Sequence, residues 1–246
     1  MSCGCLRVAP LIGIIAIILK IVRMTIMDNR SLKDLLYEQV ARVGKALASP
    51  KRLEMLEMLA QGEKSVDVLA GEVGVDIKLA SAHLKSLKEA RLVQSRRDGK
   101  RIVYRLSGPD VAQLGVNLRH VAEEHLVELR LALQQMMAEP EQLAQVGRKE
   151  LLAQAKRGEV VVLDVRPADE FDTAHLPYAR SLPLAELAHR LAELPREVEI
   201  VAYCRGPFCL MSDEAVKLLR RHGYRARKTF DGVSEWQAAG LPVRRR

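Results

Sequence analysis

The sequence has few cysteines, and their positions exclude a disulfide-stabilised fold. Four occur in 246 residues: Cys3 and Cys5 near the N-terminus, and Cys204 and Cys209 in one short segment. Secreted domains that depend on disulfides space their cysteines along the chain as a framework, and this sequence has no such framework. We therefore expect a protein of the reducing cytoplasm.

The chain also lacks a hydrophobic run that suits a membrane span or a secretory signal. Its most apolar stretch, VAPLIGIIAIILKIV at residues 8–22, is interrupted by Lys20 and falls short of the roughly 20 apolar residues that a span needs. No cleavage site of small residues follows it. We interpret residues 1–27 as an upstream extension of the reading frame, with the working protein beginning at Met24 or Met27. A membrane tether is the alternative, and we expect no membrane partner.

Internal repeats and low-complexity tracts are absent too. The sequence is 48% hydrophobic, which suffices for a normal core, and its length favours two domains of roughly 100 residues each. Its 39 Lys and Arg against 31 Asp and Glu give a net charge of +8. That excess favours a polyanionic partner without identifying it.

Helical periodicity dominates the first part of the chain. Apolar residues recur there at spacings of three and four, which predicts helices over residues 31–47, 49–62, 65–74 and 76–93. Ser49 and Pro50 suit the start of the second helix, and Gly62 suits its end. The fourth helix has an apolar stripe and a polar face; the stripe consists of Ile77, Ala80, Leu84 and Leu87.

The period then changes to two. In LVQSRRDGKRIVYRLS the pair Asp98-Gly99 separates two strand-like runs, which predicts a β-hairpin. Its inward-facing residues would be Ile102, Tyr104 and Leu106. Residues 109–139 predict one long helix, and its apolar stripe is longer than a small domain covers. We therefore expect this helix to pair with a second copy of the chain.

The predicted order is three helices, a further helix with a polar face, and a basic hairpin. This is the order of elements in a winged helix-turn-helix. Residues 76–106 hold nine Lys or Arg and three Asp or Glu, so positive charge gathers where DNA phosphates would lie. A merely solvated face is the alternative interpretation. The candidates for groove contact are Lys78, Ser81 and Lys85, and those for backbone contact are Arg96, Arg97, Lys100 and Arg101.

The segments SPKRLEMLEML, LASAHLKSLKEARLV and RRDGKRIVYRLS resemble the ArsR-type repressors over about residues 31–135. The resemblance implies a DNA-binding and dimerisation domain over residues 28–138. It also implies a homodimer that reads a palindromic double-stranded operator with one recognition helix per half-site.

Many ArsR-type repressors sense metals, but the metal-binding residues are not matched here. The cysteine pair of the family would fall at Ser65 and Asp67, and neither is a thiol. A second pattern of the family uses the dimer helix, where this chain offers His120, His125 and Glu128 at a different spacing. The two histidines point roughly 140° apart on a helix of 3.6 residues per turn. We therefore expect no metal site, no other cofactor, and structural roles for these histidines.

The second part of the chain alternates strands with helices. Pro140 and Gly147 mark a linker over residues 139–148. Beyond it, over residues 149–246, KELLAQAKRG and SDEAVKLLRRHG predict helices, the second with Ser212 as its N-cap, and EVVVLDVR, EIVAYC and YRARKTF predict strands. Such alternation predicts an α/β domain with a parallel sheet.

The segment YCRGPFC places Cys204 between a predicted buried strand and a helix. Backbone amides and the helix N-terminus meet at such a junction, and they lower the pKa of a thiol below its free value of about 8.5. Gly206 gives the turn freedom, Pro207 stiffens it, and Arg205 adds positive charge. Both phosphate ester cleavage and sulfur transfer use this arrangement. The phosphatase pattern needs an arginine at position 210, where Leu210 stands, so sulfur transfer is favoured.

The segments LDVRPADEFDTAHLPYARSLPL and TFDGVSEWQAAGLPV, with the Cys204 loop, resemble the rhodanese domain over about residues 145–243. The resemblance implies that Cys204 accepts a sulfane sulfur as a persulfide, from thiosulfate, polysulfide or another persulfide. The matched loop residues are Arg205, Gly206, Pro207, Phe208 and Cys209, and those interpreted as scaffold are Asp164, Arg166, Glu170 and His175. Two positions depart from the family: Asp231 replaces the first of two glycines, and Cys209 replaces a residue that is often polar.

Cys209 has two interpretations. It resolves a persulfide on Cys204 into a bridge between the two sulfurs, or it is a small apolar residue that packs the helix start. For the whole chain we expect a homodimeric transcriptional regulator, a repressor, whose rhodanese-like half senses or carries sulfane sulfur. The alternatives are a sulfurtransferase with an attached DNA-binding module, and a regulator whose second half is an inert dimerisation or partner module.

Overall fold

The computed structural model describes residues 28–136, 143–144 and 146–246. The expectations for residues 1–27, and for the part of the linker around Pro140, lie outside these ranges. In the part of the chain that the structure describes, no helix is both long and apolar enough to cross a membrane. The chain divides into two compact units, Met1–Ala48 and Ser49–Arg246.

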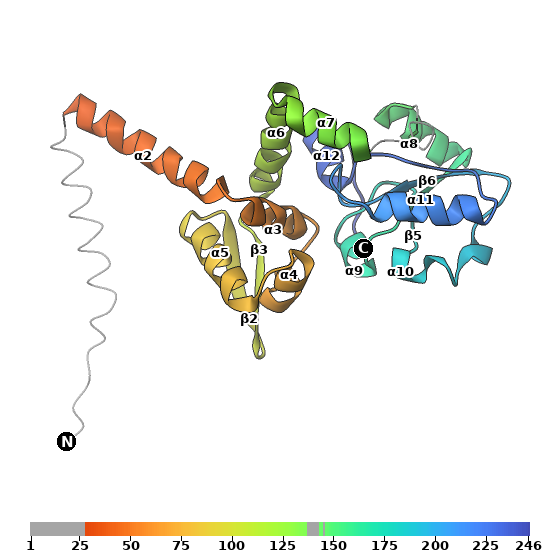
Figure 1. Cartoon of the computed structure of the whole chain (residues 1–246), viewed down its shortest axis with the longest axis horizontal. Helices are drawn as coiled ribbons and strands as arrows, with labels where there is room; N and C mark the ends of the chain where they lie inside the picture. Colours follow the sequence, from red (N-terminus) through yellow and green to blue (C-terminus); the bar gives the residue numbers. More distant parts are fainter. Residues whose placement is uncertain (1–27, 137–142, 145) are drawn as a thin grey trace, which may run out of the picture. The chain divides into compact units, whose positions relative to one another are not determined.

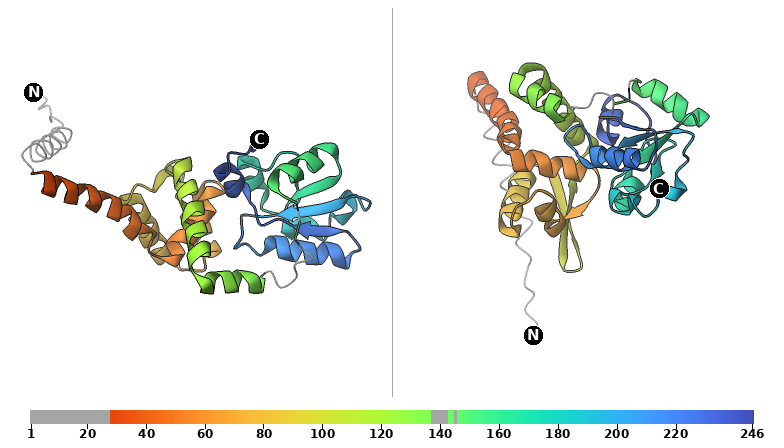
Figure 2. Two further views of the ribbon diagram at one scale, coloured as in Figure 1. Left: turned by 90° about the horizontal axis from the view of Figure 1, so that it is seen from above. Right: turned by 45° about the vertical axis from the view of Figure 1, so that its right-hand side comes forward.

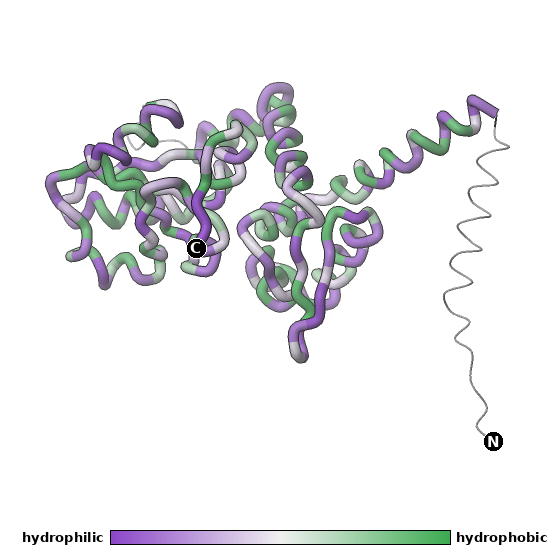
Figure 3. Tube along the Cα trace, turned by 180° about the vertical axis from the view of Figure 1, so that it is seen from behind, coloured by the Kyte–Doolittle hydropathy of each residue, from purple (hydrophilic) through white to green (hydrophobic). Residues whose placement is uncertain are grey.

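Helix α2 (Asn29–Leu47) is the described part of the first unit (Figure 1). It begins two residues before the predicted start because the Asp28 side chain accepts hydrogen bonds from the amides of Arg30 and Ser31. Hydrophobic and hydrophilic residues alternate along this helix (Figure 3). Among its exposed apolar side chains are Leu36, Tyr37 and Val40.

The second unit begins with a winged helix-turn-helix, as predicted. Its elements are α3 (Pro50–Ala60), β1 (Lys64–Ser65), α4 (Val66–Glu72), α5 (Ile77–Glu89), β2 (Val93–Asp98) and β3 (Arg101–Leu106). The three strands form an antiparallel sheet in the order β1-β3-β2. Ala80, Leu84 and Leu87 of α5 are fully buried, whereas Ile77 is exposed at the first turn. The predicted apolar stripe therefore begins one turn later than the sequence indicated.

The hairpin of β2 and β3 forms as predicted, but its turn is Gly99-Lys100, one residue later than the predicted Asp98-Gly99. Asp98 pairs with Arg101, and Gly99 between them has a φ of +58°, in the region that favours glycine. Tyr104 is buried and Leu106 is half-buried, as expected for inward-facing residues. Ile102 is exposed, so its predicted inward orientation is wrong. It lies next to the turn, where the hairpin extends beyond the helices that would cover it.

The predicted long helix over residues 109–139 is interrupted. The chain forms α6 (Pro109–His125) and α7 (Val127–Met136), and Leu126 between them has an extended backbone with ψ of 107°. Helical periodicity is the same on both sides of Leu126, and neither proline nor glycine marks the break. The pattern therefore gave no sign of it.

The rest of the second unit is an α/β fold with a parallel sheet, as predicted. The sheet has the order β5-β4-β6-β7 and consists of β4 (Val160–Asp164), β5 (Arg180–Ser181), β6 (Glu199–Tyr203) and β7 (Ala226–Lys228). Its helices are α8 (Arg148–Arg157), α9 (Ala168–Thr173), α10 (Leu184–Leu187), the 3-10 turn η2 (Leu191–Glu193), α11 (Met211–Arg221) and α12 (Val233–Ala238).

Alternate residues of the sheet pack into two cores. Leu163 and Ala202 face one core with Leu219 of α11, and Val162 and Val201 face the other. Figure 2 shows α8 and α11 on opposite faces of the sheet. The carboxyl end of β6 between these cores leads directly to Cys204.

Candidate functional site

Cys204 lies at the end of β6, with α11 beginning seven residues later at Met211. Its sulfur is 3.3 Å from the Ser212 hydroxyl, 3.4 Å from the carbonyl oxygen of Cys209 and 3.9 Å from that of Gly206. Only 2% of the residue is exposed. The structure therefore places the predicted nucleophile at the strand–helix junction and covers it with its own loop.

Ser212 does not cap α11, so that prediction is wrong. The N-cap position belongs to Leu210, and Ser212 is the second residue of the helix. Its hydroxyl is instead hydrogen-bonded to the sulfur of Cys204. The sequence therefore placed the start of the helix two residues too late and assigned the serine side chain to the wrong partner.

Hydrogen bonding makes Cys204 acidic. A hydrogen bond with the Cys209 side chain is the largest cause, and bonds with the Ser212 side chain and with the backbone of Ser212 and Gly206 act in the same direction. They outweigh burial, which raises the pKa, and the pKa of Cys204 falls to about 7. The same contact and burial raise the pKa of Cys209 far above its usual range. Near pH 7 Cys204 is thus divided between thiol and thiolate, whereas Cys209 stays protonated and donates to the Cys204 sulfur.

The rest of the loop separates into buried and exposed residues. Gly206 has a φ of +157°, which a residue with a side chain rarely adopts. Phe208 is exposed and Pro207 is half-buried, whereas Cys209 packs against the core beneath α11. Both thiols therefore lie on the inner side of the loop.

Arg205 does not face the sulfur as a free cation. Its guanidinium group lies 2.6 Å from a carboxylate oxygen of Glu170 and 2.6 Å from one of Glu72. Two carboxylates balance its single charge. Arg205 therefore does not supply the positive charge that was expected beside the Cys204 sulfur. Nothing in the sequence indicated the contact with Glu72, because Glu72 lies 133 positions away from Arg205 along the chain.

The four scaffold residues are buried or half-buried and bonded within the fold. Arg166 is almost fully buried, with a guanidinium nitrogen 2.6 Å from Asp164 and another 2.7 Å from the side-chain oxygen of Gln61. The Tyr203 hydroxyl donates to Asp164 as well. His175 stacks on Phe171 with ring centroids 3.8 Å apart. These contacts support the interpretation of these residues as scaffold.

The residues around Asp231 show how one departure from the rhodanese pattern is accommodated. Asp231 accepts two hydrogen bonds of 2.7 Å from Arg148. The next residue, Gly232, lies against the loop: a Cβ atom there would be 2.4 Å from the carbonyl oxygen of Arg205. Only glycine allows this approach, so the second of the two glycine positions carries the packing constraint.

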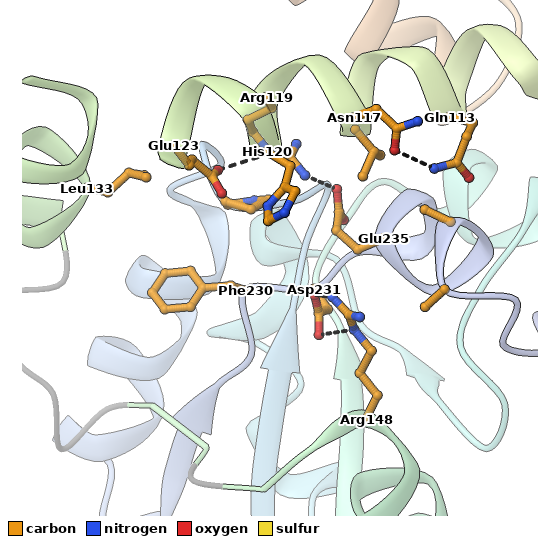
Figure 4. Close-up of a pocket in the computed structure, with 14 residues that line it drawn as sticks. Gln113, Asn117, Arg119, His120, Glu123, Leu133, Arg148, Phe230, Asp231 and Glu235 are labelled. Carbon is orange, nitrogen blue, oxygen red and sulfur yellow. Dashed lines mark hydrogen bonds and ion pairs between the residues drawn. The ribbon is translucent and has the colours of Figure 1, made fainter. Parts of the chain in front are cut away.

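A cavity of about 470 Å³ lies between α6, α7 and the loops of the α/β fold (Figure 4). Arg119 of α6 crosses its edge, with ion pairs of 2.5 Å to Glu235 and 3.3 Å to Glu123. Pro207 of the loop lines the cavity, but Cys204 is not among the lining residues. The sulfur is therefore separated from this cavity by the loop.

The candidate DNA contacts are exposed on two elements. Lys78, Ser81 and Lys85 lie on the face of α5 that the core leaves free. The hairpin presents Arg96, Arg97, Lys100 and Arg101, all exposed. Arg96 is paired at 2.8 Å with Glu63 and at 3.3 Å with Asp98, so its charge is partly compensated.

The described residues contain no group of three or more His, Cys, Asp or Glu side chains that could hold a metal ion. His120 lines the cavity, His125 is the last residue of α6, and Glu128 lies on α7 beyond the break. The interruption at Leu126 thus places Glu128 on a different helix from the histidines.

Two families match this chain. Residues 49–95 match the bacterial regulatory proteins of the arsR family, and residues 147–239 match the rhodanese-like domain. The HTH-type transcriptional regulator Rv0324 of Mycobacterium tuberculosis is 46% identical over 211 residues, which cover 86% of this chain and 92% of that protein.

Other similar proteins match the first half. The HTH-type transcriptional regulator KmtR of Mycobacterium tuberculosis is 43% identical over 84 residues, covering 34% of this chain and 65% of that protein. Among solved structures, the homodimeric winged helix-turn-helix DNA-binding domain (fragment 1–100) of Mycobacterium bovis is 47% identical. The match between the two covers 42% of this chain and 93% of that domain, and the TM-score is 0.38.

Proposed function

The chain belongs to the ArsR family of DNA-binding transcriptional regulators and carries a rhodanese-like domain, and we propose that it is a repressor whose affinity for its operator responds to sulfane sulfur at Cys204. The observation that carries the proposal is the buried thiol at the carboxyl end of β6, with its pKa lowered to about 7. A thiolate at neutral pH is the form that attacks sulfane sulfur.

The proposed partner is double-stranded operator DNA, bound in the cytoplasm by a homodimer. Apolar side chains remain exposed on α6 and α7, among them Leu118, Val121 and Leu131. Such side chains, aligned on helices beside a DNA-reading unit, support pairing with a second copy of the chain. Two recognition helices one turn of DNA apart, about 34 Å, then read the two half-sites of a palindrome.

The chemistry at Cys204 is a transfer of sulfur. The thiolate attacks the outer sulfur of a donor R–S–SH, the bond between the two donor sulfurs breaks, and R–S⁻ leaves with its electron pair. Cys204 then carries an S–SH group. In a second step the Cys209 sulfur attacks the inner sulfur of Cys204, a bridge forms between the two residues, and the outer sulfur and both protons leave as H₂S. The donor sulfur is reduced and the two thiols are oxidised.

The match to the rhodanese-like domain favours one other function, a sulfurtransferase with an attached DNA-binding module. The 2% exposure of Cys204 argues against rapid exchange of donors and acceptors at this site. Steady turnover of thiosulfate with cyanide, together with an operator affinity that is indifferent to sulfur loading, would favour the enzyme.

A gel-shift titration on the intergenic DNA upstream of the gene tests the proposal. The protein is compared in the reduced form, after polysulfide treatment, and as Cys204→Ser. Sulfur loading is expected to change the affinity of the wild type by at least about fivefold, the lower end of typical couplings between sites. Cys204→Ser should give one affinity under both conditions. Equal affinities for the reduced and loaded wild type would refute the proposal.

Intact-mass measurement of the same samples separates the two interpretations of Cys209. A loaded protein with a bridge has lost two hydrogens and gained no sulfur, whereas a persulfide adds one sulfur atom. If Cys209 stays unlinked under every condition, it is a packing residue and the response rests on the persulfide alone.

A further inference from the structure

Arg205 follows the reactive cysteine directly, yet its side chain binds the DNA-reading half of the chain. One guanidinium nitrogen lies 2.6 Å from Glu72 and 3.1 Å from the sulfur of Met58, and a second lies 3.2 Å from Glu72. Arg205 is 8% exposed. A fork of donors on one carboxylate fixes both distance and orientation, so this contact ties the loop to α4.

A second carboxylate holds the same guanidinium group from the α/β side. Arg205 lies 2.6 Å from Glu170, and Glu170 also accepts from Lys64 of β1 at 2.8 Å. Burial raises the pKa of Glu170, but the bonds from Arg205 and Lys64 lower it below its ordinary value. Two cations and two anions thus form a balanced cluster, and the cluster is buried except at Glu72.

The backbone of the loop is held as firmly as the side chain. Gly232 packs against the carbonyl oxygens of Cys204 and Arg205 with no room for a Cβ atom. The amide of Gly232 donates to Glu235 at 2.8 Å, and Glu235 pairs with Arg119 of α6 at 2.5 Å. A change in the shape of the loop is therefore not absorbed locally.

Sulfur loading requires such a change. The sulfur of Cys204 is surrounded at 3.3–3.9 Å by the groups described above. A further sulfur atom bonded at about 2.05 Å occupies space that the closely packed loop already fills. A bridge to Cys209 likewise replaces a hydrogen-bonded contact between the two side chains by a covalent bond. In either case the residue that follows Cys204 has to shift.

Glu72 is well placed to pass this shift to DNA. It is the last residue of α4, and the turn of residues 73–76 joins it to α5, where Asp76 caps the recognition helix. We propose that Arg205 is the positioning residue that couples the Cys204 loop to the recognition helix, by holding Glu72 in the reduced protein and releasing it when the loop changes shape. This inference rests on the proposed function. It assigns α4 as the helix through which sulfur loading at Cys204 alters the position of the recognition helix.

Linkage provides a test that does not depend on sulfur. If DNA binding and the loop are coupled through Glu72, DNA must change proton binding at Cys204 by the same factor as deprotonation changes DNA affinity. The measurement is the pH profile of Cys204 alkylation by iodoacetamide, followed on the Cys204 peptide by mass spectrometry. It is made with and without the upstream intergenic duplex.

Glu72→Gln is the test variant and Glu199→Gln the matched control. The two carboxylates are 32% and 31% exposed, and Glu199 pairs with Arg227 at 3.0 Å within the α/β fold. In the wild type and the control, DNA is expected to move the midpoint of the profile by at least about 0.7 pH unit, which corresponds to a fivefold coupling. In Glu72→Gln the midpoint should be the same with and without DNA, and operator affinity should no longer respond to polysulfide.

The possible results separate the two proposals. A Glu72→Gln protein that keeps both responses overturns the role of Arg205 and leaves sulfur sensing intact. Loss of both responses in Arg119→Gln but not in Glu72→Gln also overturns it, because the route then runs through α6. A wild type whose midpoint moves with DNA through Glu72, but whose affinity ignores polysulfide, refutes sulfur sensing and supports the coupling. A wild type whose midpoint does not move with DNA, together with a polysulfide response that survives Glu72→Gln, overturns the coupling.

Discussion

Cys204 combines burial with acidity, two properties that oppose each other in most thiols. Burial raises a thiol pKa because the thiolate loses its solvation. Here hydrogen bonds from the Cys209 side chain, the Ser212 side chain and nearby amides outweigh that cost. Since the sulfur is also shielded from solvent, small reagents should reach it more readily than large ones.

The reactivity of Cys204 should therefore depend on pH in a defined way. Its alkylation by iodoacetamide is expected to have a midpoint near pH 7, against about 8.5 for a free cysteine. Cys209→Ala removes the largest cause and should raise the midpoint, while Cys209→Ser keeps a donor and should leave it nearly unchanged. A midpoint near 8.5 in the wild type would contradict the described geometry.

The same shift predicts the pH dependence of stability. The pKa of Cys204 is lower in the folded protein than in the unfolded chain, so the thiolate contributes stability that is complete above about pH 9. This contribution is lost as the pH falls through about 7. Urea unfolding at several pH values should show that wild type loses more stability than Cys204→Ser between pH 9 and pH 6. Parallel curves for the two proteins would show that the thiol is not ionised.

Gly232 is a second residue whose role depends on one close approach. Gly232→Ala places a Cβ atom against the carbonyl oxygens of the Cys204 loop and should destabilise the fold by about 1–3 kcal/mol. Gly115→Ala is the control: it lies in α6 with open space around it, and alanine favours a helix, so stability should be unchanged or increased. Urea unfolding measures both, and equal stabilities would show that the loop yields to the methyl group.

At the scale of elements, the hairpin and α5 owe their exposed cations to the way each element packs. The core takes the apolar side of α5, so Lys78, Ser81 and Lys85 remain on the free side. The hairpin extends past the helices, so its tip is exposed on both faces, as Ile102 shows. Nothing in this arrangement selects a base sequence at the hairpin, which suits contact with the phosphate backbone.

Arg101→Ala should consequently weaken DNA binding without changing sequence preference. Removal of one phosphate contact is expected to lower affinity for all duplexes and to reduce the slope of log K against log salt by about 1. Arg157→Ala, an exposed arginine of the α/β fold, should leave the slope unchanged. A shift in sequence preference at constant slope would show that Arg101 reads bases.

At the scale of the whole molecule, apolar side chains on helices of both compact units remain exposed. They include Val40 of α2, 69% exposed, and Val121 of α6, 55% exposed. Isolated exposed apolar residues are common, but several on one helix are typical of a helix that packs against a partner, and this holds for α2 and for α6 separately. The proposed homodimer explains them.

Val121→Glu is expected to dissociate this dimer, since a charge in an apolar interface costs several kcal/mol. Sedimentation equilibrium should give twice the chain mass for the wild type and a concentration-dependent lower mass for the variant. Ile102→Glu is the control, because Ile102 is similarly exposed, at 49%, but lies on the hairpin. A variant that keeps the wild-type mass would exclude α6 from the interface.

The sequence by itself determined most of the longer helices and strands, because periodicity and turn residues are local, and its motifs resembled those of the two families that match the chain. It placed the hairpin turn within one residue of its position, the parallel sheet in the second half, and Cys204 between a strand and a helix. It could not reveal the break at Leu126, because the apolar spacing continues across it without proline or glycine.

Only the tertiary structure decided which partners the loop residues have. It turned Arg205 toward Glu72 and Ser212 toward the Cys204 sulfur, and it placed Gly232 against the loop backbone. Some of these contacts join residues that are far apart along the chain, and in others a side chain binds one of several partners within its reach. No local sequence pattern reveals which partner a side chain binds, because the free energy that decides it comes from burial and charge pairing in the assembled fold.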